Sequence, residues 1–311
     1  MRISFMEPFS RGWGRMKKAL FQPFDIGKWF TVGFTAFLAE LTEWHHGGGG
    51  NSGHKGHTDW EDFFRFPRVA WGWLTDNPFW FTMIVFGLFL LIMIIVLLIW
   101  LSSRGKFMFL DNVVHDRAKV VQPWHDFKKQ GNSLFVWRFG FSLACFVLFV
   151  TFLVFFFITL YHLYDGYAPR STMILTIVGM GLMLLVMIII TATISLFLND
   201  FVVPIMAIHG TNAVQAWGRF LPLLSRYFLY FILYGILIFF LYILIVISVI
   251  IIGLLTCCIG FILLILPYIG SVIMLPISYT LRAFSLEFLG QFGPEFSIFP
   301  QVKKAAVSHK A

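Results

Sequence analysis

Charged residues are scarce in this chain. Only 12% of its 311 residues are Asp, Glu, Lys or Arg, about half the roughly 25% that is typical of soluble domains. Hydrophobic residues make up 59%, and several apolar runs are longer than 20 residues. This composition excludes an ordinary soluble globular domain and predicts an integral membrane protein.

Cysteines are also few. The three in the chain, Cys145, Cys257 and Cys258, all fall inside apolar runs. Adjacent cysteines rarely pair with each other, and no C-x-x-C spacing is available for a metal. We therefore expect buried free thiols and no disulfide framework.

The sequence lacks the common catalytic motifs. It has no Walker A lysine loop, no G-x-S-x-G, no H-E-x-x-H and no haem-type C-x-x-C-H. The centres of the long apolar runs carry almost no charge, although ion-coupled transporters usually place acids there. We expect a protein that is not an enzyme and that needs no cofactor.

Six apolar segments are candidate membrane spans. Five are unambiguous, because each exceeds the roughly 20 residues that cross a hydrocarbon core and a backbone in lipid must pair its polar groups within a helix. The first, residues 26–44, is the weakest: it has Lys28 at one end and Glu40 and Glu43 at the other, and it either crosses or is re-entrant. The predicted spans are 26–44, 79–101, 134–161, 173–198, 227–252 and 254–279.

The lysine and arginine residues predict the orientation of these spans. With the N-terminus inside, the segments 1–28, 102–138, 199–226 and 280–311 are cytoplasmic and hold 19 of the 23 Lys and Arg residues. This bias predicts that both termini are cytoplasmic, and it favours crossing by residues 26–44. It also explains the net charge of +8 without a nucleic-acid-binding domain. The four basic residues on the other side are Lys55, Arg65, Arg68 and Arg170.

Two inner segments have amphipathic patterns. In residues 1–25, Trp13 and Leu20 recur at helical spacing opposite a basic side, which predicts a helix lying among the headgroups of an anionic leaflet. In residues 102–133, Phe107 and other apolar residues fall on one stripe, which predicts an interfacial helix that ends near Pro123.

Parts of this pattern recur along the chain. FLNDFVV at 197–203 echoes FLDNVV at 109–114, and each lies at the inner end of a span. We expect an all-α bundle of three hairpins with amphipathic helices on the cytoplasmic face. Chance similarity between apolar hairpins is the alternative.

Five short stretches resemble uncharacterised bacterial multi-pass membrane proteins related to the glycerophosphoryl diester phosphodiesterase membrane domain. The resemblance implies a six-helix domain in the bacterial cytoplasmic (inner) membrane. It implies no phosphodiesterase chemistry, because that activity would belong to a separate soluble barrel domain. The stretches are FQPFDIGKWF (21–30), SRGKFMFLDNVVHDR (103–117), NSLFVWRF (132–139), NDFVVPIM (199–206) and SLEFLGQFG (285–293).

Five charged residues near inner span ends are candidate site residues: Asp111, Arg138, Asp200, Arg282 and Glu287. Ionisable groups near membrane depth are often functional. We predict a cytoplasmic-side polar cluster in which one of the two aspartates pairs with one of the two arginines. The alternative is that each side chain reaches the headgroups separately.

A glycine-rich outer loop, residues 45–76, contains the second candidate site. His45, His46, His54 and His57 suit Zn²⁺, Cu²⁺ or Ni²⁺ as neutral imidazoles. Ordering such a flexible loop costs entropy, so any metal binding is expected to be weak. A solvated loop without metal is the alternative.

These observations predict a non-enzymatic scaffold or accessory subunit that interacts with lipids, including anionic headgroups at the inner face, with a membrane-protein partner or with a second copy of the chain. The alternative is a transporter or lipid-handling protein. A wide cavity bounded by Asp111, Arg138 and Asp200 would favour transport, whereas a filled interior with an exposed apolar seam would favour a scaffold.

Overall fold

The computed structural model describes residues 3–43, 69, 71–165, 169–256 and 259–299. The chain divides into two compact units. Unit 1 comprises residues 1–44, 99–140 and 190–311, and unit 2 comprises residues 45–98 and 141–189. In the described ranges all regular structure is helical, which confirms the predicted all-α class.

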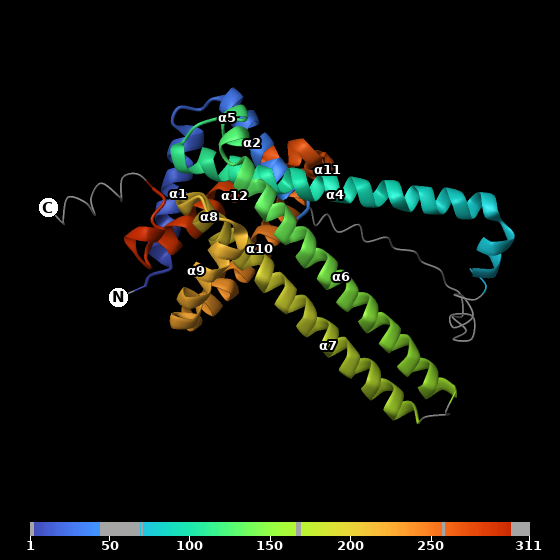
Figure 1. Cartoon of the computed structure of the whole chain (residues 1–311). Coiled ribbons are helices and arrows are strands. Elements are labelled where there is room, and N and C mark those ends of the chain that lie inside the picture. The colour runs from blue at the N-terminus through green and yellow to red at the C-terminus, as the bar shows by residue number, and fades with distance from the viewer. Residues whose placement is uncertain (1–2, 44–68, 70, 166–168, 257–258, 300–311) are drawn as a thin grey trace. The chain divides into compact units, whose positions relative to one another are not determined.

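The helices are named as in Figure 1. Their bounds are α1 Met6–Phe21, α2 Ile26–Glu40, α4 Pro78–His115, α5 Val121–Asp126, α6 Lys128–Asp165, α7 Arg170–Phe197, the π-helical η1 Leu198–Val202, α8 Val203–His209, α9 Ala213–Arg226, α10 Phe228–Leu255, α11 Ile259–Ile265, α12 Pro267–Gly290 and the 3-10 helix η2 Pro294–Phe296.

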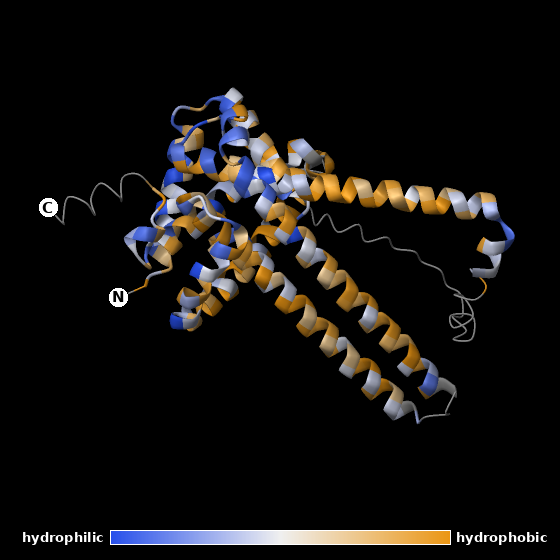
Figure 2. Cartoon of the chain, in the orientation of Figure 1, coloured by the Kyte–Doolittle hydropathy of each residue, from blue (hydrophilic) through white to orange (hydrophobic). Residues whose placement is uncertain are grey.

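Five helical stretches of the described chain are long and apolar enough to cross a membrane. Figure 2 colours long parts of the α4, α6 and α7 ribbons orange, which marks hydrophobic residues. In lipid such surfaces need no polar cover. The chain is therefore a helical protein of the membrane class. The five stretches are Pro78–His115, Lys128–Leu163, Ser171–His209, Phe228–Leu255 and Tyr268–Gly290.

The last of these differs from the predicted span 254–279. In the structure α10 continues to Leu255, the short α11 follows, and α12 begins at Pro267. Proline disfavours a helical conformation in the residue before it, and Leu266 is accordingly extended, with ψ 114°. Pro267 can still occupy the first turn of the new helix, where its missing N–H is not needed.

Helix α2 is too short to count among the five. Its 15 residues extend about 22 Å, and it lies beside α12 in the same direction. The Tyr268 hydroxyl donates to the Phe30 carbonyl at 2.9 Å, and ten residues further along the Ser278 hydroxyl donates to Glu40 at 2.8 Å. In a protein with six alternating spans the first and the last run in opposite directions, so the parallel pair α2 and α12 does not fit that arrangement. Crossing by residues 26–44 thus stays a prediction.

The apolar side of α1 is covered by protein. Phe5 stacks on Phe288, Phe9 packs edge-on against Phe284, and Met16 and Leu20 are buried. Close approach is possible because Gly12 faces the α12 backbone. Trp13 remains exposed, so a headgroup contact by residues 1–25 stays a prediction with a smaller apolar surface than the sequence suggested.

The inner part of α4 lies in the protein interior rather than along the membrane interface. Residues 102–115 continue α4 without a break, and all thirteen residues Ser102–Val114 are buried. An apolar stripe indicates that one side of a helix is covered, but it does not say by what. Here protein covers it: the α4 backbone approaches α2 closely at Gly105, and Phe107 stacks on Phe127 with 5.6 Å between ring centroids.

Candidate functional site

An aromatic core in unit 1 fixes the helix ends that carry the candidate site. Phe201 stacks on Phe220 with 5.4 Å between ring centroids, and it packs against Phe231 at 5.0 Å and Tyr234 at 4.9 Å. All four side chains are fully buried. Rings packed at these separations hold one another in place. The ends of η1, α9 and α10 are therefore held in a defined geometry.

The π-helical turn frees one backbone carbonyl. The Val203 N–H bonds to the Leu198 carbonyl, one residue further back than in an α-helix. The next residue, Pro204, has no N–H. The Asn199 carbonyl therefore lacks a partner within the helix, and it accepts a hydrogen bond from Arg282 Nη1 at 2.5 Å.

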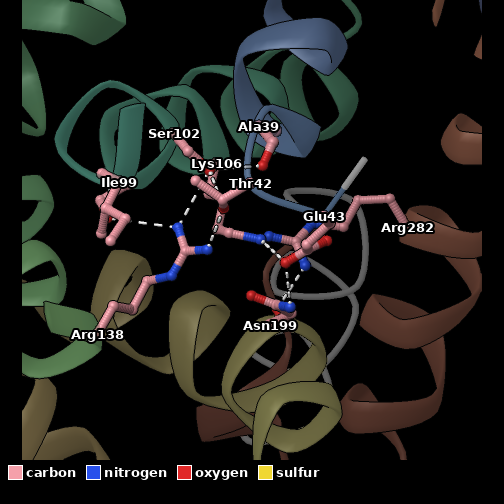
Figure 3. Close-up of polar contacts among 10 residues, drawn as sticks. Ala39, Thr42, Glu43, Ile99, Ser102, Lys106, Arg138, Asn199 and Arg282 are labelled. Atoms are coloured by element: carbon pink, nitrogen blue, oxygen red, sulfur yellow. Dashed lines mark hydrogen bonds and ion pairs between the residues drawn. The ribbon is translucent and has the colours of Figure 1, made fainter. Parts of the chain in front are cut away.

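Glu43 lies at the centre of the polar contacts. It follows α2 in a turn, and its Oε1 accepts from Lys106 Nζ at 2.5 Å and from Asn199 Nδ2 at 2.6 Å. Figure 3 shows Lys106, Asn199 and Arg282 directed toward it. Its side chain is 40% exposed, whereas that of Lys106 is 6% exposed.

Arg138 contacts hydroxyl groups. Its Nη2 donates to Thr42 Oγ1 at 2.6 Å, and its Nη1 donates to Ser102 Oγ at 3.1 Å and Ser103 Oγ at 3.4 Å. Ser102 also donates to the Ala39 carbonyl at 2.9 Å. In Figure 3 Arg138 and Arg282 lie on opposite sides of the group of polar side chains. The end of α2 is therefore bound through Thr42 as well as Glu43.

We call Glu43, Lys106, Arg138, Asn199 and Arg282 the Glu43 cluster. Of its three cations, only Lys106 has a carboxylate within 4 Å among the described residues. Two nearby acids have neutral partners instead: Glu40 accepts from Ser278, and Asp200 accepts from the Tyr234 hydroxyl at 2.8 Å. Arg282 Nε and Asn199 Oδ1 are buried without a hydrogen-bond partner in the described part of the chain.

The five predicted site residues do not gather in one place. Arg138 and Arg282 join the Glu43 cluster, and Asp200 lies next to Asn199 but bonds to Tyr234. Asp111 forms a bidentate pair with Arg117, whose Nη2 and Nε donate to its two oxygens at 2.8 and 3.0 Å, and Glu287 pairs with Arg15 at 2.8 Å. Across the described ranges no ion pair joins Asp111 or Asp200 to Arg138 or Arg282.

Three residues of the Glu43 cluster were not predicted as site residues: Glu43, Lys106 and Asn199. In the sequence Glu43 marks one end of the weakest span, and a second acid, Glu40, lies three residues before it. Asn199 belongs to the FLND echo. Pro204, five residues later, was the available signal that the Asn199 carbonyl would be free.

The histidine site lies outside the described residues. His45, His46, His54 and His57 all fall in the range 44–68, which the structure does not describe. Weak metal binding by this loop stays a prediction. In the described ranges no group of three or more His, Cys, Asp or Glu side chains is placed to hold a metal ion.

The geometry of Asp111 gives a first testable prediction. Asp111→Asn and Arg117→Gln should be non-additive, with a coupling of about 1 kcal/mol or more, because the two groups share a buried hydrogen-bonded pair. Asp111→Asn and Arg138→Gln should add to within about 0.5 kcal/mol, because they share no partner. Unfolding of the single and double variants in detergent measures both. Equal coupling in the two cycles would contradict this assignment.

Comparison with known families places this helical membrane-class protein in a family. A family of unknown function, DUF7544, matches residues 6–269, and the chain belongs to it. The matched range includes every residue of the Glu43 cluster except Arg282. Neither curated proteins nor solved structures give a significant match. The resemblance to the glycerophosphoryl diester phosphodiesterase membrane domain stays a prediction.

Proposed function

We propose that this chain is a non-enzymatic membrane scaffold or accessory subunit that binds lipids or membrane-protein partners. The observation that carries the proposal is the filled interior of unit 1. Phe201, Phe220, Phe231, Tyr234 and Phe288 are each fully buried where the helix ends meet. Interiors packed in this way are as dense as organic crystals, so a substrate could pass only after rearrangement.

An exposed apolar surface on α10 supports the same proposal. Phe239 is 62% exposed, and Phe240, Leu244 and Ile247 are exposed as well. Such a surface suits lipid or another membrane helix, and a scaffold needs one. A filled interior combined with an exposed apolar surface is what we expect of a scaffold rather than of a transporter.

Native mass spectrometry of the gently extracted, full-length protein tests this proposal. We expect masses above that of the 35.9 kDa chain, from a protein partner, a second copy or retained lipid. A bare monomer under several mild extraction conditions would contradict the proposal. The spectrum would also reveal a bound metal.

The second candidate is a lipid-handling protein, which the Glu43 cluster favours because, among the described residues, neither Arg138 nor Arg282 forms an ion pair with a carboxylate. Purified protein in liposomes distinguishes the two. A scaffold leaves the exchange of labelled phospholipid between leaflets at the rate of empty liposomes. Faster exchange would favour lipid handling and count against the scaffold.

We further propose that both termini lie in the cytoplasm of a bacterial inner membrane, which requires an even number of crossings. The support is the clustering of 19 of the 23 Lys and Arg residues in the predicted inner segments. In a background without native cysteines, Ser52→Cys should react with an impermeant maleimide in sealed right-side-out vesicles, and Ser308→Cys should not. Equal labelling of the two positions would overturn this topology.

A further inference from the structure

We propose that the Glu43 cluster is an anion site that takes the phosphate of an anionic phospholipid, and that the Glu43 carboxylate is its internal occupant. The proposal deepens the lipid-binding part of the proposed function and relies on it only for membrane location. Four groups from four helices converge on Glu43: Lys106 of α4, Arg138 of α6, Asn199 of η1 and Arg282 of α12 (Figure 3).

The cations have more donor capacity than the structure uses. Arg138 donates only to hydroxyl groups and Arg282 to a backbone carbonyl, so neither guanidinium has an anion within 4 Å among the described residues. A buried charge without a close counter-ion is costly. Within the described part of the chain Arg282 Nε has no hydrogen-bond partner, and Arg282 is only 9% exposed. A phosphate offers several acceptor oxygens in a geometry that guanidinium groups bind well.

Glu43 is the acid of the cluster that a phosphate can displace. It lies in a turn rather than inside a helix, and its side chain is the exposed member of the pair with Lys106. The other two acids, Glu40 and Asp200, have their own partners in Ser278 and Tyr234. Replacing one carboxylate with one phosphodiester leaves the net charge unchanged, so the exchange adds no unbalanced charge.

The position of the cluster along the helices favours a lipid phosphate over free phosphate. Arg138 directly precedes the exposed apolar stretch of α6 that begins at Phe139. Lys106 follows the apolar stretch of α4 within about two helical turns of Trp100. Basic groups at such boundaries, set between membrane helices, match the depth at which headgroup phosphates lie.

The test uses delipidated full-length protein in a non-ionic detergent, titrated with phosphatidylglycerol and read by native mass spectrometry. Glu43→Gln removes the competing charge but keeps an acceptor for Asn199, so lipid should bind about tenfold more tightly, a change of roughly 1.4 kcal/mol. Arg138→Gln should bind about tenfold more weakly. The matched control is Glu287→Gln, an equal charge change at the Arg15 pair, and it should bind like wild type.

Three further measurements test the site and the lipid assignment separately. Phosphatidylcholine should bind more weakly than phosphatidylglycerol, and inorganic phosphate should not compete at equal concentration. Equal binding by Glu43→Gln, Arg138→Gln and wild type would overturn the site, and effective competition by inorganic phosphate would overturn the lipid assignment. If Glu43→Gln fails to fold, Arg138→Lys, which keeps the charge but loses the planar fork, should weaken binding less than Arg138→Gln. A protein that fails these tests but retains a partner subunit loses the site and keeps the scaffold role.

Discussion

Gly105→Ala should destabilise the protein, whereas Gly87→Ala on the same helix should not. A Cβ at Gly105 would lie 2.5 Å from the Leu38 carbonyl carbon and 2.7 Å from the Ala39 nitrogen, and backbone atoms cannot move aside as a flexible side chain can. We expect a loss of about 1–3 kcal/mol, the usual cost of overpacking. The melting temperature in detergent measures it.

The control separates packing from helix propensity. At Gly87 no described atom lies within 4 Å of an added Cβ. Alanine is the better helix former by about 1 kcal/mol, so Gly87→Ala should leave the melting temperature unchanged or raise it. A similar loss at both positions would show that α2 and α4 do not meet as described. Gly105→Ala should also weaken the Glu43 cluster, because Glu43 lies in the turn that follows α2.

The second large effect is expected at the centre of the aromatic core. Phe201→Ala should cost about 3–5 kcal/mol, because it removes a fully buried ring and leaves a void among rigid neighbours. Phe239→Ala, which truncates a ring that is 62% exposed on α10, should cost much less. Thermal unfolding of the two variants in the same detergent gives the comparison. Equal losses would contradict the assignment of Phe201 to the core.

The helical class and five apolar spans could be predicted from the sequence because long apolar runs leave the backbone no alternative in lipid. The last apolar stretch begins at Tyr268 in the structure rather than at residue 254, because Pro267 separates α11 from α12, whereas hydropathy alone runs through 254–279. The buried state of residues 102–114 was also beyond the sequence, since one stripe of apolar residues looks the same against lipid and against protein.

The candidate site was only partly predictable for a related reason. Charge and position identified Arg138 and Arg282, but the choice of partners depends on how helices far apart in sequence pack together. Asp111 finds Arg117 six residues away, so a local pair replaced the expected long-range one. Glu43 meets Lys106 and Asn199 across 63 and 156 residues, and no local pattern announces such contacts.

Alignment of the two similar stretches relates the π-helical turn of η1 to one additional residue. FLDNVV at 109–114 and FLNDFVV at 197–203 differ in length by a single insertion, Phe201. The first stretch lies in regular α-helix, and the second contains the widened turn. The added residue shifts the helical register and places a ring at the centre of the aromatic core. It also leaves a backbone carbonyl free to accept a hydrogen bond from Arg282. Of two similar segments, only the longer one can contribute its main chain to the Glu43 cluster.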